Sequence, residues 1–159
     1  MFSQTVCRPM EILLVEDGLL DARVTILALG RCSIHHRVTL VRSISEALAF
    51  VRQEGVFRRA PQPDLVLLDL LLPDGKGTDL LRDLRQMPNL SEVPVVVLTA
   101  SGDPENRTIC STLKVDDYIE KPVDEDKFLR VVREHKRLLV FGARALRSVF
   151  PEHTLATSP

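Results

Sequence analysis

Short apolar runs alternate along the chain with stretches whose apolar residues recur at helical spacing. Five runs predict buried strands, at residues 11–15, 38–41, 64–68, 93–98 and 118–120. The stretches between and after them predict five helices, at residues 19–29, 43–51, 77–84, 104–113 and 124–147. This alternation is typical of βαβ units. We therefore expect an α/β fold with a doubly wound, five-stranded parallel sheet and helices on both faces.

Local signals refine three of these helices. Ser43 and Glu46 form an S-x-x-E capping box, and Asp124 is an N-cap candidate followed by two acidic residues. The last helix is expected to run unbroken from there to about residue 147. In the first helix, the apolar residues predicted to share one face are Leu20, Val24, Leu27 and Ala28.

Composition narrows the classes of function. The chain has 159 residues, which fits one domain, and its 21 basic and 22 acidic residues give a net charge of −1. This balance argues against nucleic-acid binding. The cysteines, Cys7, Cys32 and Cys110, match no metal or redox spacing, which indicates reduced thiols and a cytoplasmic location. No apolar run approaches the length of a membrane span, and residues 1–10 lack the apolar segment of a signal peptide.

Polar side chains follow four of the five predicted strands. Glu16 and Asp17 follow the first strand, Asp69 the third, Thr99 the fourth and Lys121 the fifth. In an open parallel sheet these ends meet at one edge, where ligands bind. Three carboxylates there repel one another, and a hard divalent cation such as Mg²⁺ relieves that repulsion. Each residue alone has an ordinary structural explanation, but their order along the chain favours a functional site.

Four motifs carry a resemblance to the receiver domain of two-component response regulators: LLVED at 13–17, LVLLDLLLPDGKG at 65–77, VPVVVLTAS at 93–101 and DDYIEKP at 116–122. The resemblance covers about residues 11–139. It implies the flavodoxin-like strand order 2-1-3-4-5. It also implies a protein that switches by phosphorylation and is not an enzyme in the usual sense.

The resemblance implies a role for each residue of the acidic group. Asp69 would accept a phosphoryl group from a sensor histidine kinase. Asp17, Asp69 and the backbone carbonyl of Leu71 would bind Mg²⁺, and Glu16 would act through a metal-bound water. No other cofactor is expected.

The other matching positions would bind the phosphoryl group or respond to it. Lys121 would pair with one phosphoryl oxygen and Thr99 with another, while the small Ala100 would leave room for the group. Thr99 and Tyr118 would form the switch pair, changing a face built by the fourth helix, fifth strand and fifth helix. The bond between Lys121 and Pro122 would be cis and would set the direction of the lysine.

Two positions depart from the commonest receiver pattern, and three alternative functions remain open. Lys114–Val115 replaces the small pair often found before the DDY segment, and apolar Leu71 predicts slow self-dephosphorylation. A phosphohydrolase of the haloacid dehalogenase type would need an acid at Leu71. A nucleotide-binding P-loop would need an earlier glycine and a serine or threonine directly after the lysine, and both are missing around Gly75, Lys76 and Gly77. The intact acidic, threonine and lysine set disfavours a binding-only pseudo-receiver.

We expect an N-terminal tail at 1–10, a receiver domain at 11–139, and a helical extension with a tail at 140–159. Leu138, Phe141, Ala145 and Val149 continue an apolar stripe into the extension. The stripe either folds back on its own domain or forms a homodimer, and we lean to the dimer. The extension is too short for a DNA-binding domain. The chain also looks similar to single-domain regulators that pair with bacterial phytochrome kinases.

Overall fold

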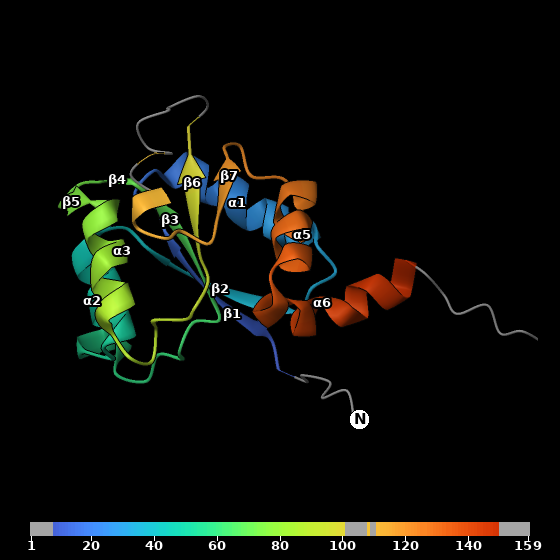
Figure 1. Ribbon diagram of the computed structural model, residues 1–159, viewed down its shortest axis with the longest axis horizontal. Coiled ribbons are helices and arrows are strands. Elements are labelled where there is room, and N and C mark those ends of the chain that lie inside the picture. Colours follow the sequence, from blue (N-terminus) through green and yellow to red (C-terminus); the bar gives the residue numbers. More distant parts are fainter. Residues whose placement is uncertain (1–7, 101–107, 109–110, 150–159) are drawn as a thin grey trace, which may run out of the picture.

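The computed structural model describes residues 8–100, 108 and 111–149, with side chains described as far as Gly142. Its centre is a parallel sheet in the order β2-β1-β3-β6-β7 (Figure 1). The strands are β1 (Met10–Val15), β2 (His36–Val41), β3 (Leu65–Asp69), β6 (Val95–Thr99) and β7 (Asp117–Glu120). Counted along the chain this is the order 2-1-3-4-5, so the predicted topology is confirmed.

Helices cover both faces of the sheet, as predicted. On one face lie α1 (Leu19–Arg31) and α5 (Glu125–Glu134), and on the other lie α2 (Ile44–Val51) and α3 (Gly77–Gln86) (Figure 1). A 3-10 turn, η1 (Gly55–Phe57), follows α2. The helix predicted at 104–113 lies mostly outside the described residues, although 108, 111 and 112 are helical.

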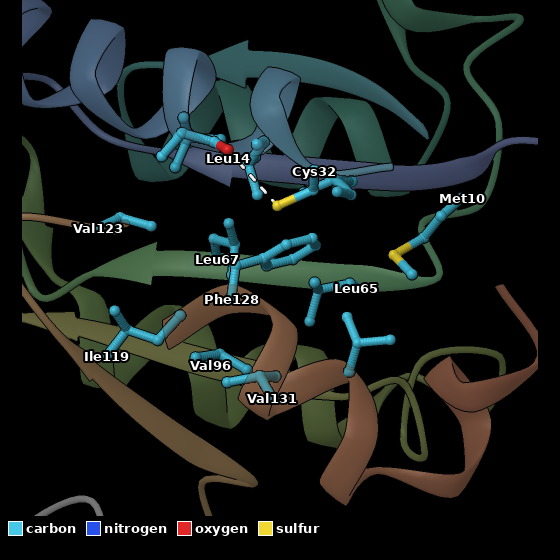
Figure 2. Packing of buried hydrophobic residues seen from close by; sticks show 14 of the residues in the cluster. Met10, Leu14, Cys32, Leu65, Leu67, Val96, Ile119, Val123, Phe128 and Val131 are labelled. Atoms are coloured by element: carbon cyan, nitrogen blue, oxygen red, sulfur yellow. Dashed lines mark hydrogen bonds between the residues drawn. The ribbon is translucent and has the colours of Figure 1, made fainter. Parts of the chain in front are cut away.

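Alternation along the strands divides the core into two clusters. Leu14 of β1 and Leu67 of β3 point toward α1 and α5, and their neighbours Leu13 and Leu68 point toward α2 and α3. Phe128 of α5 is fully buried at the centre of the first cluster (Figure 2). Because both faces of the sheet are covered, β1 and β3 are apolar without alternation, which explains their continuous runs.

The buried face of α1 differs from the prediction. Leu20, Val24 and Leu27 are 75%, 36% and 53% exposed. The helix instead packs through smaller residues and one leucine, namely Ala22, Thr25, Ala28 and Leu29. Only Ala28 of the predicted face is therefore buried. Small side chains allow the helix to lie close to the sheet, and the larger apolar side chains are left on its outer surface.

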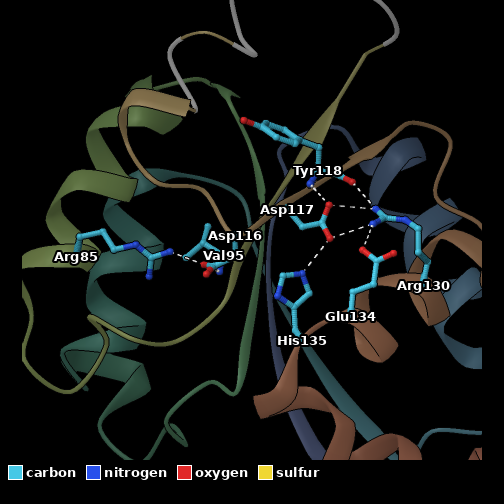
Figure 3. A network of polar contacts seen from close by, with 8 residues as sticks. All are labelled: Arg85, Val95, Asp116, Asp117, Tyr118, Arg130, Glu134 and His135. Carbon is cyan, nitrogen blue, oxygen red and sulfur yellow. Dashed lines mark hydrogen bonds and ion pairs between the residues drawn. The ribbon is translucent and has the colours of Figure 1, made fainter.

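The C-terminal helical run also differs from the prediction, because it is divided at His135 into α5 and α6 (Lys136–Val149). The backbone of His135 is extended, with φ −112° and ψ 114°. Its ring nitrogen Nε2 lies 2.9 Å from Oδ2 of Asp117, which also binds Arg130 (Figure 3). Helical periodicity continues across this break, so sequence alone gives no sign of it.

The helix caps follow the sequence signals. The Ser43 hydroxyl accepts a hydrogen bond from the Glu46 amide at 3.1 Å, and Asp124 accepts one from the Lys127 amide at 2.8 Å. The Glu46 carboxylate binds the amide of Arg42, one residue before the position that a complete capping box would use. A small antiparallel hairpin was not predicted: β4 (Leu71–Leu72) pairs with β5 (Gly75–Lys76) directly after β3.

Candidate functional site: an acidic cluster with a lysine

The structure brings the predicted acidic residues together at the carboxyl end of β1 and β3. Glu16, Asp17 and Asp69 each offer a carboxylate oxygen, and these oxygens lie within 4.8 Å of one another. Glu16 is 1% exposed and Asp69 is 8% exposed. A set of carboxylates at this spacing fits a hard divalent cation such as Mg²⁺.

Lys121 reaches into this cluster from the segment after β7. Its Nζ donates to Oε2 of Glu16 at 2.7 Å, to Oδ2 of Asp69 at 2.8 Å and to Oδ2 of Asp21 at 3.1 Å. Burial disfavours the charged lysine, but the hydrogen bonds with these carboxylates outweigh it and raise the Lys121 pKa. Lys121 therefore stays charged at the pH of the cell and neutralises part of the acidic cluster.

Glu16 behaves differently because it is buried most deeply. Burial raises the pKa of Glu16 to about 7, with a further increase from Asp69 and an opposing effect of Lys121. Its Oε1 accepts a hydrogen bond from the amide of Gly18 at 3.1 Å. Near neutral pH this carboxyl group is therefore partly protonated, and a cation would compete with that proton.

Backbone contacts fix Asp69 within the site. Its Oδ1 accepts a hydrogen bond from the Leu71 amide at 2.9 Å, which leaves Oδ2 facing Lys121. Gly77, at the start of α3, passes so close that a Cβ there would lie 2.7 Å from the Asp69 carbonyl oxygen. Only glycine fits this approach, and the Gly77 amide bonds to the Leu70 carbonyl at 3.0 Å.

The remaining predicted residues lie at the same edge. Thr99 ends β6, and its carbonyl accepts the Lys121 amide at 2.7 Å. Ala100, Lys121 and Pro122 line a cavity of about 460 Å³ beside α1. The peptide bond between Lys121 and Pro122 is cis, so that prediction is confirmed. Tyr118 is half-buried on β7 and packs against the cluster beneath α2 and α3.

Sequence reasoning missed Asp21 at the site and Asp74 in the hairpin that follows Asp69. Asp21 contacts Lys121 from the first turn of α1, and its place in the first turn of the helix predicted directly after Asp17 was the available signal. Asp74, in the turn of the β4–β5 hairpin, accepts hydrogen bonds from the amides of Ile44 and Ser45 at 2.8 and 3.0 Å. These amides lower the pKa of Asp74, and the contact ties the hairpin to the start of α2.

Comparison with known proteins identifies the family. A family model for the response regulator receiver domain matches residues 12–133. The chain belongs to this receiver family. Response regulator Rcp1 of Synechocystis sp. (strain ATCC 27184 / PCC 6803 / Kazusa) is 38% identical over 113 residues, covering 71% of this chain and 77% of Rcp1. The protein is a response regulator with one receiver domain, and phosphorylation of an aspartate in a two-component system is its function. The hydrolase and P-loop alternatives are thereby set aside.

Solved structures agree with this assignment. The Mn²⁺-bound form of Rcp1 matches with a TM-score of 0.68 and 37% identity, covering 77% of this chain and 89% of that one. The phosphorylated cyanobacterial phytochrome response regulator RcpA matches with a TM-score of 0.68, 34% identity and 88% and 96% coverage. The bacteriophytochrome response regulator RtBRR matches with a TM-score of 0.72, 29% identity and 89% and 95% coverage. A divalent cation in Rcp1 agrees with the carboxylate cluster of this receiver.

Binding of Mg²⁺ is expected to strengthen as pH rises through the pKa of Glu16, about 7. A protonated Glu16 is neutral and offers less attraction to a cation, and metal and proton therefore compete. Calorimetric titration should give an affinity roughly tenfold higher at about pH 8 than at about pH 6. Glu16→Gln should remove most of this pH dependence. An Mg²⁺ affinity that is equal at both pH values in the wild type would contradict the expectation.

Proposed function

We propose that this receiver stores a signal as a phosphoryl group on Asp69, taken from the phosphohistidine of a sensor histidine kinase. The observation that supports the proposal is the pairing of Asp69 Oδ2 with Lys121 Nζ at 2.8 Å, beside Glu16 and Asp17. A carboxylate is a suitable acceptor because the acyl phosphate it forms is reactive and therefore reversible. Cys32 is free and buried, in keeping with the cytoplasmic location that we also propose.

The proposed transfer uses the side chains gathered at this edge of the sheet. Oδ2 of Asp69 forms a bond to phosphorus while the bond from phosphorus to the histidine nitrogen breaks. Lys121 pairs with a phosphoryl oxygen, and Thr99 donates its hydroxyl to another. Ala100 leaves the space that the group enters. A bound Mg²⁺, held by Asp17, Asp69 and the Leu71 carbonyl and reached by Glu16 through water, would offset the charge of the transferring group.

Thr99 and Tyr118 form the proposed switch pair on neighbouring strands. In the register of β6 and β7, Val97 lies opposite Tyr118 and Thr99 opposite Glu120. Arg130 of α5 donates to the Tyr118 carbonyl at 2.9 Å (Figure 3). A movement of β7 would therefore also displace the Arg130 side chain of α5. Phosphorylation would shift the population between two packings of β7, α5 and the helix predicted at 104–113.

The outer surface of α1 supports a kinase as the partner. Leu20 and Val24 line the same cavity as Ala100, Lys121 and Pro122. Exposed apolar side chains grouped beside a reaction site are typical of a surface that binds another protein. A helix docked there would bring its phosphohistidine to the open side of Asp69.

None of the described helices is long and apolar enough to cross a membrane. The likeness to RcpA and RtBRR favours a bacteriophytochrome as the kinase.

Phosphorylation by a small phosphodonor tests the proposed function. With Mg²⁺, intact mass should show one added phosphoryl group, and chelation of the metal should prevent it. Leu20→Ala is the control variant, because it shortens an apolar side chain that is 75% exposed and adds no charge beside Lys121. It should accept the small donor as the wild type does and lose transfer from a kinase. Absence of the adduct with Mg²⁺ present would reject a phosphoacceptor in favour of a binding-only receiver.

Self-dephosphorylation is expected to be slow because Leu71, two residues after Asp69, presents an apolar side chain. Leu71 is 77% exposed on the hairpin beside the site and offers no group that orients an attacking water. Decay of the acyl phosphate should be faster in Leu71→Asn than in the wild type, by roughly tenfold for one water-orienting hydrogen bond. Equal decay rates would remove this role of Leu71.

We also propose that the distal part of α6 forms a homodimer. Leu138 is fully buried and Phe141 packs against the core, so the start of the stripe folds back on its own domain. Arg8 stacks over the Phe141 ring at 5.3 Å from its centroid. Beyond Gly142 the helix extends away from the domain (Figure 1), and a lone projecting helix is stabilised chiefly by packing against a partner.

Truncation after Gly142 is expected to convert a dimer to a monomer in sedimentation experiments. The cut preserves Leu138 and Phe141, whereas a cut after Leu138 would remove part of the core. The truncated chain should keep its phosphoryl uptake from a small donor, since no described side chain of the site lies beyond Val123. An unchanged dimer after truncation would exclude the distal part of α6 as its main support.

A further inference from the structure

A second cavity, of about 400 Å³, lies between the last turns of α3 and the segment that leads into β7. None of the residues that line it belongs to the phosphoacceptor site. Three of them are cationic and one is acidic: Arg82, Arg85, Lys114 and Asp116. The volume falls within the range of small-molecule sites, about 300–1,000 Å³.

Arg85 is held firmly at the wall of this cavity. Its NH1 donates to the carbonyls of Val93 at 2.8 Å and Ser91 at 3.3 Å, and its NH2 donates to Asp116 at 2.5 Å. Asp116 is fixed in turn by the amide of Val95 at 2.8 Å (Figure 3). The guanidinium charge is therefore positioned before any ligand arrives, which reduces the entropy cost of binding.

Lys114 is the unexpected residue of the group. Its φ is +56°, a left-handed conformation that follows the helical residues 111 and 112. Glycine or asparagine ordinarily takes such a position, and a lysine there is strained. The residue is exposed, and the described residues give its ammonium group no hydrogen bond or ion pair. The strained backbone at Lys114 therefore places a positive charge at the rim of this basic cavity.

Arg82 is the third cation and is largely available. Its only ion pair among the described residues joins it to Asp79 at 3.2 Å, and both side chains are more than half exposed. A pair of this kind contributes little and exchanges easily. Three cations against one carboxylate, around a concave space, are a suitable arrangement for an anion with several oxygens.

We propose that this cavity binds a small phosphate-bearing anion of the pyrophosphate type, independently of the phosphoacceptor site. The exposed Arg82 supplies a planar donor pair that matches phosphate oxygens, and Lys114 supplies a compact point charge. Arg85, whose donors hold Val93, Ser91 and Asp116, adds positive charge at the wall of the cavity. The concave shape favours a small ligand over a flat protein surface. The site would account for Lys114 at a position where the receiver pattern has a small residue.

Titration of the metal-free protein with inorganic pyrophosphate, followed through backbone amide shifts, tests this proposal. Saturable shifts are expected at Arg82, Arg85 and the segment 113–116. Lys114→Gln and Arg82→Gln should each weaken binding by roughly tenfold, the effect of one charge-assisted contact. Arg133→Gln, on α5 outside the cavity, removes the same charge and should leave binding unchanged.

Lys114→Gly separates binding from folding. It should weaken pyrophosphate binding while its unfolding midpoint is equal to or higher than that of the wild type, because glycine relieves the left-handed strain. A lower midpoint would contradict the argument from strain. Shifts confined to Glu16, Asp69 and Lys121, no saturable shift at all, or equal weakening in Arg133→Gln would overturn the cavity as a specific anion site.

Discussion

Replacement of Asp69 by asparagine is expected to abolish phosphoryl uptake, with a loss of more than about a thousandfold in rate. The amide has nearly the same shape as the carboxylate and can still accept the Leu71 amide through Oδ1. It has no nucleophilic oxygen anion to form the acyl phosphate, and it removes one charge from the cation site. Intact mass after incubation with a small phosphodonor and Mg²⁺ measures the effect.

Asp79→Asn provides the matched control, because it makes the same chemical change at an exposed carboxylate on α3. This variant should be phosphorylated as fully as the wild type. Both variants should unfold in one cooperative transition, which shows that the domain is intact. A phosphoryl adduct of normal yield on Asp69→Asn would mean that another residue accepts the group.

Replacement of Lys121 by glutamine is expected to have the second largest effect, and the effect has two opposite parts. Phosphoryl uptake should slow by about a hundredfold, since one charged donor to the transferring group is lost. Divalent-cation binding should instead become tighter, because the lysine charge that pairs with Glu16 and Asp69 no longer opposes the cation. A merely structural role for Lys121 would weaken both.

Calorimetric titration with Mg²⁺ and the rate of uptake from a small phosphodonor together measure this divergence. Both should be recorded well above the pKa of Glu16, because loss of Lys121 removes the hydrogen bond that lowers that pKa. Lys136→Gln, at the exposed start of α6, controls for the loss of a positive charge and should change neither quantity. Weaker Mg²⁺ binding in Lys121→Gln would contradict the electrostatic role assigned here.

The gathering of the site residues could be predicted from the sequence because it depends mainly on the strands being parallel. Once the strands are parallel, Asp17, Asp69, Thr99 and Lys121 must reach the same edge, whatever the details of packing. The apolar runs of β1 and β3 are continuous because both faces are covered, so their identification needed no contact information. The parallel sheet and the gathering of the acidic residues followed from those two features, whereas the strand order came from the resemblance to receiver domains.

Features that depend on long-range contacts could not be predicted. The break at His135 is associated with Asp117, a residue 18 positions earlier that becomes its neighbour only in the folded chain. The buried face of α1 was misassigned because hydrophobicity was taken as a guide to burial, whereas close packing on the sheet selected the smaller Ala22 and Thr25. Leu20 and Val24, on its outer surface, are informative for the same reason, since they line the cavity beside Lys121.

Asp116 and Asp117 are adjacent in sequence, but their side chains point to opposite sides of the sheet. Asp116 turns to α3 and holds Arg85, while Asp117 turns to the opposite side and holds Arg130 and His135 (Figure 3). Burial opposes the charge on Asp117, but hydrogen bonds from Arg130 and His135 lower its pKa. The pair thus links one short strand to helices on both faces of the sheet.

Reduction of the phosphorylated protein with borohydride, followed by peptide mass spectrometry, tests the central claim most directly. Borohydride reduces an aspartyl phosphate to homoserine and leaves a free carboxylate and phosphorylated hydroxyl or histidine side chains unchanged. The structure predicts homoserine at position 69 in the wild type treated with phosphodonor and Mg²⁺, and none when the metal is chelated. An unreduced Asp69 in a protein that carries the phosphoryl mass, or homoserine at another aspartate, would contradict the assignment of Asp69 as the phosphoacceptor.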